Sequence, residues 1–187
     1  MPRLDETVAR EVAFEFLGTP STPRDPKVAA AYKQLQLQSD RLFASLTADA
    51  PGGSFRVVFT RCREPYISDV ELIRAVRATR LLEVATVAID RGRLHPFLGN
   101  EVGGAYDRFR AVHDLVGHVQ NGFGFDRNGE YAAWLAQDGR HSGLARLALA
   151  TELHAEHSVL WSTGMPADHK AILIAPIVLN RARCGVG

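Results

Sequence analysis

Several features that would assign a protein to a membrane or secreted class are missing from this sequence. No uninterrupted apolar run approaches the roughly 18 residues that a membrane-spanning helix needs. The opening segment, MPRLDETVAREVAFEF, carries acidic residues among its apolar ones and has no signal-peptide core. Cys62 and Cys184 lie far apart without a CxxC spacing, which is typical of reduced thiols rather than a disulfide framework. We therefore expect a cytoplasmic protein with no membrane partner.

Lysine is also scarce, and the net charge is close to zero. Only Lys27, Lys33 and Lys170 are lysines, so arginine supplies most of the positive charge, and the formal net charge is +1. The sequence contains no basic stripe suited to nucleic acid and no glycine-rich phosphate-binding loop. These absences predict a small-molecule substrate rather than a nucleic acid, and they leave the oligomeric state open.

The length and composition suit a single globular domain. The chain has 187 residues, of which 46% are hydrophobic and 23% charged, enough to bury a substantial core. The segment GTPSTPRDP, residues 18–26, combines glycine, prolines and hydroxyl residues and reads as a loop. We therefore expect an N-terminal arm over residues 1–25 and one domain over residues 26–187.

Local patterns predict an α+β fold, with a small strand-containing N-terminal half followed by a mainly helical C-terminal half. Strands are indicated where β-branched and aromatic residues cluster, and helices where apolar residues recur at helical spacing. The expected strands cover residues 54–60 and 81–89. The expected helices cover residues 27–46, 69–80, 102–121, 129–137, 143–163 and 167–183.

The stretch YDRFRAVHDLVGH places two histidines, His113 and His118, five residues apart. On a regular α-helix they would be separated by about 140°. Opposite the apolar stripe, the same helix carries Arg110, Asp114 and Gly117, which could form either a solvated face or the wall of a cleft. Both rings can reach one ion only if the helix ends or bulges near Gly117, or if long reach across the groove compensates, so the spacing alone leaves metal binding open.

A second histidine-rich stretch, ATELHAEH, offers a carboxylate. Glu152 and Glu156 are one helical turn apart beside apolar residues, where a charge is costly to bury without a cation. Either glutamate could complete a His–His–carboxylate set, which suits Fe(II) or Zn(II). The alternative is that both form surface ion pairs with arginines.

The remaining candidates have simpler interpretations. Glu130 follows a loop at an expected helix start, where an acid complements the helix dipole or supports a histidine. We expect the other histidines to lie in loops, at the surface or on the outer side of their helix: His95, His141, His154, His157 and His169.

Three segments, FRAVHDLVGH, GEYAAW and TELHAEHS, resemble in order the motifs of an uncharacterised domain of phage and mobile-element proteins. That domain is often found inside very large polyproteins, and the resemblance spans residues 60–165. It favours Glu152, within the TE pair, over Glu156 as the third ligand, and it makes Glu130 part of the motif set. No established activity comes with this resemblance.

The segment HDLVGH also resembles the HDxxGH or HExxGH segment of the aromatic amino-acid hydroxylases, in which two histidines and a later glutamate hold catalytic iron. This resemblance implies that His113 and His118 are iron ligands, with Glu152 or Glu156 as the third. A further resemblance is to the HD-type phosphohydrolases. In that case His113 and Asp114 form the HD pair, His95 is the upstream histidine, and Asp138 or Asp168 completes the set.

The leading hypothesis is a mononuclear metalloenzyme with His113, His118 and Glu152 as ligands of Fe(II), or alternatively of Zn(II). Arg110 is expected to bind an anionic group of the substrate. Iron predicts oxidation or hydroxylation of a small molecule, and zinc predicts hydrolysis. The competing hypotheses are the phosphohydrolase and a non-catalytic interaction module of phage origin. The residues expected to assist catalysis are Asp114, Glu156 and Glu130.

Overall fold

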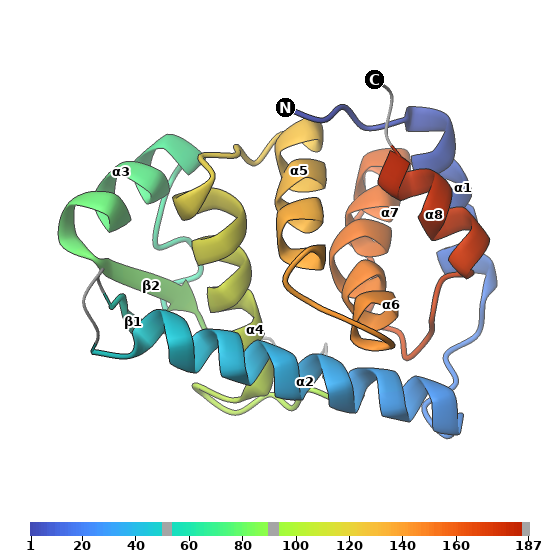
Figure 1. Cartoon of the computed structure of the whole chain (residues 1–187), viewed down its shortest axis with the longest axis horizontal. Helices are drawn as coiled ribbons and strands as arrows, with labels where there is room; N and C mark the ends of the chain where they lie inside the picture. The colour runs from blue at the N-terminus through green and yellow to red at the C-terminus, as the bar shows by residue number, and fades with distance from the viewer. Residues whose placement is uncertain (50–53, 90–93, 185–187) are drawn as a thin grey trace.

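The structure, a computed structural model, describes residues 1–49, 54–89 and 94–184. Within these ranges the fold is α+β, as the sequence predicted, with a small sheet in the N-terminal half and helices dominating the C-terminal half (Figure 1). None of the helices in the described ranges is long and apolar enough to cross a membrane.

The strands are β1 (Arg56–Thr60) and β2 (Leu81–Ala85). The helices are α1 (Glu6–Gly18), α2 (Pro26–Thr47), α3 (Asp69–Thr79), the short 3₁₀-helix η1 (Val87–Ile89), α4 (Ala105–His113), the π-helix η2 (Asp114–Gln120), α5 (Arg127–Asp138), α6 (Ala145–Leu149), the π-helix η3 (Ala150–Ala155), α7 (Glu156–Thr163) and α8 (Pro176–Cys184).

The sheet is one small βαβ unit. Strands β1 and β2 are parallel, in a register that pairs Arg56 with Leu81, and α3 makes the crossover between them. Helix α3 starts at a Ser68 cap, whose hydroxyl accepts a hydrogen bond from the Glu71 amide at 3.2 Å. A small core of buried apolar side chains, Leu72 and Leu82 among them, joins this unit to η2.

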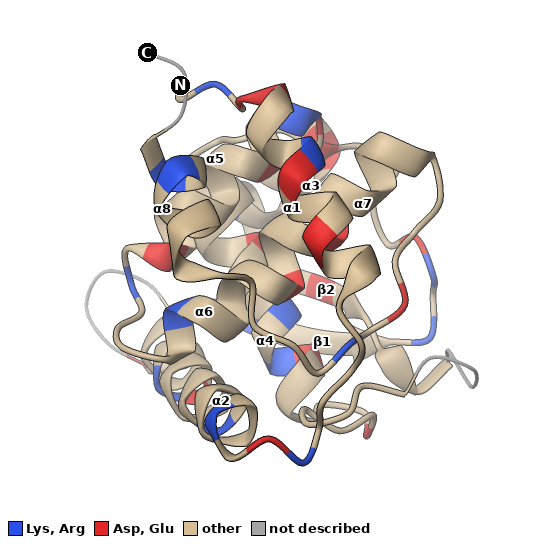
Figure 2. Cartoon of the chain, turned by 90° about the vertical axis from the view of Figure 1, so that its right-hand side faces the viewer, with Lys and Arg blue, Asp and Glu red and all other residues tan. Residues whose placement is uncertain are grey.

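The helices surround a larger core. Figure 1 shows the long helix α2 running along one edge of the molecule, where it contacts both α4 and α6. Figure 2 shows α2 nearly end-on, with α1 and α7 on the far side of the bundle from it. Tyr32 of α2 and Trp134 of α5 are almost fully buried in this core. Three helical segments thus pack around this core: α4 with η2, α5, and the consecutive helices α6, η3 and α7.

Residues 1–25, expected to form an arm, contain α1, which starts at an Asp5 cap that accepts hydrogen bonds from the Thr7 and Val8 amides. Its Val12 and Phe16 side chains are buried in the larger core, and the helix contacts α7, α8 and η3. Helix α1 is therefore an integral part of the helical bundle.

The helix expected over residues 167–183 is wrong in its first half, because α8 begins only at Pro176. Proline disfavours the helical conformation in the residue before it, and its ring suits the first helical turn. The preceding segment has no regular secondary structure, and its Ile172 and Ile174 side chains are buried in the core. The Thr22 amide donates to the Ala171 carbonyl at 2.8 Å, which attaches the segment to the loop before α2.

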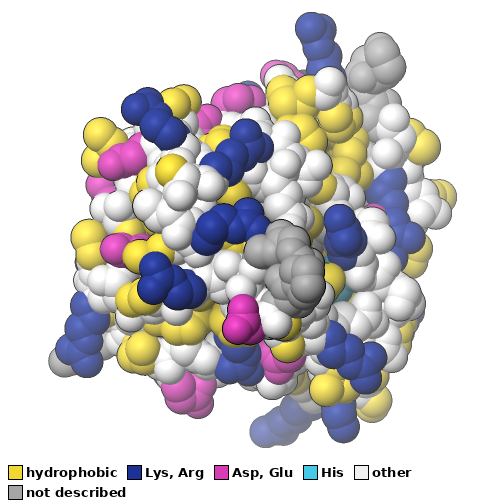
Figure 3. Space-filling view, turned by 60° about the vertical axis from the view of Figure 1, so that its left-hand side comes forward, with side chains coloured by type: hydrophobic (Ala, Val, Ile, Leu, Met, Phe, Trp, Pro, Cys, Tyr) yellow, Lys and Arg dark blue, Asp and Glu magenta, His cyan; other side chains and the backbone are white. Residues whose placement is uncertain are grey.

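Basic residues do not gather into a stripe on the face shown in Figure 3, where arginine and lysine side chains are scattered among apolar and acidic ones.

Candidate metal centre

A π-helix brings the two histidines of HDLVGH together. In the π-helix η2, hydrogen bonds run from residue i to residue i+5, so side chains five residues apart lie nearly above one another. The spacing of His113 and His118, which would separate them on an α-helix, therefore places their Nε2 atoms 3.2 Å apart. Of the ways in which the two rings could reach one ion, the structure shows a bulge at Gly117.

Hydrogen bonds orient both rings so that their Nε2 atoms face the same point. The Nδ1 atom of His113 lies 3.1 Å from Gln137 Oε1, and that of His118 lies 2.9 Å from the Phe123 carbonyl oxygen. Both partners are oxygen acceptors, so Nδ1 of each ring carries the proton and Nε2 is the atom that can hold an ion. Metal-binding histidines are oriented in the same way by a partner at the other ring nitrogen.

Glu130, in the first turn of α5, supplies the carboxylate. Its Oε2 atom lies 3.3 Å from His113 Nε2 and 3.6 Å from His118 Nε2. Ligand atoms bound to one zinc ion at 2.0–2.1 Å are about 3.3 Å apart for tetrahedral angles and about 2.9 Å apart for right angles. The three observed separations, 3.2 to 3.6 Å, agree with three donors arranged around one ion.

The electrostatics of this cluster favour a shared positive charge. Burial by itself would raise the pKa of Glu130, but hydrogen bonding to His113 and the charges of the neighbouring histidines lower it to about 2. Burial lowers the pKa of His113, yet the Glu130 carboxylate more than offsets this effect, so the pKa is raised overall. Burial and the neighbouring His113 lower the pKa of His118. The carboxylate is thus held ionised beside nitrogen atoms that compete for one positive charge, which a divalent cation would supply.

Gly117 allows η2 and α5 to approach closely. A Cβ atom at this position would lie 2.7 Å from the Ala133 Cβ, well inside ordinary carbon–carbon contact. Since α5 also carries Glu130 and Gln137, this approach brings both partners within reach of the histidine pair.

A third histidine faces the same carboxylate. His157 Nε2 lies 3.8 Å from Glu130 Oε2, while its Nδ1 donates to the Leu153 carbonyl at 2.7 Å. The expectation that His157 points to the outer side is wrong, because the π-helix η3 shifts the angular position of every residue after it. The signal in the sequence is a second five-residue spacing, Glu152 to His157, which repeats that of the histidine pair across a second π-helix.

The structure does not place Glu152 with the histidine pair. Its Oε1 accepts a hydrogen bond from the Tyr32 hydroxyl at 2.6 Å, and its Oε2 lies 3.1 Å from His95 Nε2. The third donor beside the histidine pair is Glu130, and Glu152 belongs to a second cluster with Glu156 and His169. The sequence offered both Glu152 and Glu156 beside an apolar stripe, and the TE motif favoured Glu152. Glu130 was expected to complement a helix dipole or to support a histidine, although the resemblance made it part of the motif set.

Both clusters open on one cavity of about 240 Å³, whose lining includes His113, His118, Glu130, Glu152 and Glu156.

Two more of the expected site residues also line this cavity. Arg110 and Asp114 face it and an adjoining pocket as well, although Arg110 Nη1 already donates to the Ala85 carbonyl at 2.7 Å. Burial raises the pKa of the Asp114 carboxyl, while His113 and His118 act to lower it. Asp114 is therefore more easily protonated than an exposed aspartate, which suits a group that exchanges a proton with a bound molecule.

Two residues that the phosphohydrolase hypothesis names, His95 and Asp138, are engaged in other contacts. His95 Nδ1 accepts hydrogen bonds from the Phe97 and Leu98 amides at 3.0 and 2.8 Å, so its proton is on Nε2 and the ring offers no lone pair to an ion. Both carboxylate oxygens of Asp138 bind arginines, Arg146 and Arg183. This geometry does not support the HD assignment.

Two other histidines are buried but lie outside the site. His154 stacks on Trp134 with ring centroids 4.3 Å apart, and burial lowers its pKa to about 3. His141 donates from Nδ1 to the Gln137 carbonyl at 2.9 Å and contacts Ser39. His141 and His154 were expected at the surface or on an outer helix face, and both are structural parts of the core.

No protein-family model, curated protein or solved structure matches this chain. The resemblances noted in the sequence therefore stay predictions, and the functional argument depends on the geometry of the site.

Proposed function

We propose that this protein is a metal-dependent enzyme whose catalytic ion is held by His113, His118 and Glu130. The observation that carries the proposal is the convergence of two Nε2 atoms and one carboxylate oxygen within 3.6 Å of one another, with both imidazoles oriented from behind by oxygen acceptors. Two imidazole nitrogens and a carboxylate this close must share a positive charge, and the orientation of both rings by oxygen acceptors at Nδ1 suits a divalent cation in that place.

The donor set favours Fe(II), with Zn(II) as the alternative. Two imidazoles and a carboxylate on one face of the ion leave other positions open, as in non-haem Fe(II) oxygenases. Bound iron would supply oxygen-dependent oxidation or hydroxylation of a small molecule, with molecular oxygen as the oxidant. Reduction of oxygen to the level of water takes four electrons, of which the oxidised bond of the substrate gives two. The other two would come from the substrate or from a reducing co-substrate. Bound zinc would supply hydrolysis by an activated water.

The protein's own residues account for binding and proton handling. Arg110, at the junction of the cavity and its neighbouring pocket, is placed to hold an anionic group of the substrate. Asp114 would exchange a proton with that substrate, and His157 would hold the Glu130 carboxylate in place or join it as a further ligand.

The test is metal analysis of the purified protein with matched histidine variants. We expect chelator-stripped protein to take up Fe(II) under anaerobic conditions, and His118→Asn to lose this ion while staying folded by circular dichroism. The control is His141→Asn, which replaces a buried histidine outside the site and should keep the ion. Equal iron uptake by the wild type and His118→Asn would overturn the proposal.

Oxygen consumption then separates the two chemistries. Iron-loaded protein that consumes oxygen with an anionic small molecule, and loses this activity in Arg110→Gln, supports the oxidase or oxygenase. Hydrolysis of an ester or amide by the zinc-loaded form, with no oxygen consumption by the iron form, would assign the site to zinc.

A further inference from the structure

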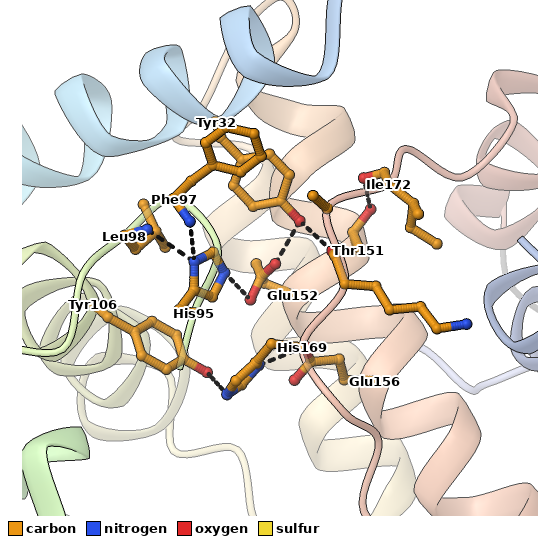
Figure 4. A network of polar contacts seen from close by, with 12 residues as sticks. Tyr32, His95, Phe97, Leu98, Tyr106, Thr151, Glu152, Glu156, His169 and Ile172 are labelled. Atoms are coloured by element: carbon orange, nitrogen blue, oxygen red, sulfur yellow. Dashed lines mark hydrogen bonds and ion pairs between the residues drawn. The ribbon is translucent and has the colours of Figure 1, made fainter. Parts of the chain in front are cut away.

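The second cluster is built around a buried carboxylate. Glu152 has a fully buried side chain, and the contacts that hold it come from the Tyr32 hydroxyl at 2.6 Å and from the His95 ring (Figure 4).

The His95 ring lies beside this carboxylate. Its Nδ1 accepts hydrogen bonds from two backbone amides, and its Nε2 lies 3.1 Å from Glu152 Oε2. Neither His95 Nε2 nor Glu152 Oε2 makes a well-aligned hydrogen bond among the described residues. A buried carboxylate oxygen without a well-aligned donor is costly, so the site favours an added cation.

The nearest lysine does not supply that charge. Lys170 follows His169 in the chain, but its ammonium donates to the carbonyls of Phe16, Leu17 and Thr19 at 2.9 to 3.1 Å.

Two further donors converge on Glu152. One ligand atom each from Glu152, Glu156 and His169 lies within 4.8 Å of the others. His169 Nδ1 is 2.9 Å from Glu156 Oε1, and its Nε2 is 3.4 Å from the Tyr106 hydroxyl, which can accept a hydrogen bond from Nε2–H, so that Nδ1 is the ring atom beside the carboxylates. Figure 4 shows His169 directed toward Glu156, next to the Glu152 carboxylate, which faces Tyr32 and His95.

We propose that Glu152, Glu156 and His169 form a second divalent-cation site, so that the cavity is lined by a two-metal centre. Two carboxylates and one imidazole suit a first-row ion such as Mn(II), Fe(II) or Zn(II). Glu152 and Glu156 line the same cavity as His113, His118 and Glu130, so a substrate in that cavity would lie beside ligands of both ions. The donor set of the second site stands without the first, although its role in catalysis rests on the proposed function.

Zinc stoichiometry tests the proposal. Chelator-stripped protein is dialysed against Zn(II) at near-neutral pH, and the bound metal is measured per folded chain by mass spectrometry. We expect two ions for the wild type, one for Glu156→Gln, one for His169→Asn and one for His118→Asn. A double variant, His118→Asn with Glu156→Gln, should bind none, and the control His141→Asn should bind two.

The outcomes separate the two proposals. One ion in the wild type that is lost in His118→Asn and kept in both Glu156→Gln and His169→Asn overturns the second site and leaves the first. One ion that is lost in Glu156→Gln and kept in His118→Asn overturns the proposed function and supports the second site. Two ions that persist in both Glu156→Gln and His169→Asn place the second ion elsewhere and overturn the assignment made here. Because glutamine matches glutamate in size, Glu156→Gln is expected to fold, and circular dichroism checks this.

Discussion

Replacing Gly117 by alanine should weaken metal binding without touching any ligand. The added Cβ would lie 2.7 Å from the Ala133 Cβ, whereas carbon atoms in ordinary contact are about 3.5–4.0 Å apart, so η2 and α5 must separate by about 1 Å. Overpacking of this kind costs about 1–3 kcal/mol, and the gain in helix propensity offsets up to about 1 kcal/mol of it. We expect a net loss of about 1–2 kcal/mol in the free energy of unfolding.

The effect on the metal follows from the same displacement. Helix α5 carries both Glu130 and Gln137, so moving it away from η2 withdraws one ligand and the group that orients His113. Loss of such an orienting contact typically lowers metal affinity by about 10–100-fold. The assay is competition for Zn(II) against a chromophoric chelator, with urea unfolding of the metal-free protein measured in parallel.

Two matched variants make the test specific. Gly139→Ala adds a Cβ at the end of α5, where the nearest atoms are 3.6 Å away and φ is −64°, so it should leave both affinity and stability near wild type. Ala133→Gly combined with Gly117→Ala removes the main clash and should restore most of the lost affinity. Unchanged affinity in Gly117→Ala, or no recovery in the double variant, would refute the argument.

Two predictions concern stability. Burial lowers the pKa of His154 to about 3, against 6.5 in the unfolded chain, so the unfolded state gains a proton that the folded state excludes as the pH falls below 6.5. The free energy of unfolding should therefore drop by about 2 kcal/mol from pH 7 to pH 5. His154→Phe keeps the stack on Trp134 and should remove this drop when urea unfolding is measured at the two pH values. An unaltered pH dependence in this variant would contradict the assignment of the drop to His154. Burial raises the pKa of Asp138, but two arginines lower it overall. The ionised carboxylate therefore contributes to stability above pH 3.8, and this contribution is lost as the pH falls through the lower pKa of the folded state. Asp138→Asn should cost about 3 kcal/mol at pH 7. Glu11→Gln, which breaks an exposed arginine pair, should cost less than about 1 kcal/mol, and equal costs would show that burial does not matter here.

Two π-helices explain why this site has an unusual sequence spacing. In α-helical metal sites, ligands on one helix stand four residues apart, whereas here His113 and His118 stand five apart. The second π-helix carries Glu152 and is followed by His157, and both residues line the same cavity. A π-helix is less favourable than an α-helix and persists where surrounding contacts stabilise it, often at functional sites.

Elements with strong local signals are predictable from this sequence. Helix α3 begins at its serine cap and the β1 pattern of β-branched and aromatic residues forms a strand, because these signals act over a few neighbouring residues. The second strand ends at Ala85, earlier than expected, where the Asp107 carboxylate accepts hydrogen bonds from the Thr86 hydroxyl at 2.6 Å and the Val87 amide at 2.9 Å. Asp107 lies twenty residues away from Val87, so no local pattern reveals this end point.

The sequence by itself determined the class of fold and the histidine pair, and it named both glutamate-bearing segments. Only the tertiary structure decided that Glu130 stands beside His113 and His118 while Glu152 joins His169, a residue with no local signal of its own. The physical reason is that the π-helical turns depend on contacts between helices, such as that of Gly117 with α5, rather than on local propensity. One extra residue per turn changes which side chains face the cavity, and helical periodicity read from the sequence assumes that no such turn occurs.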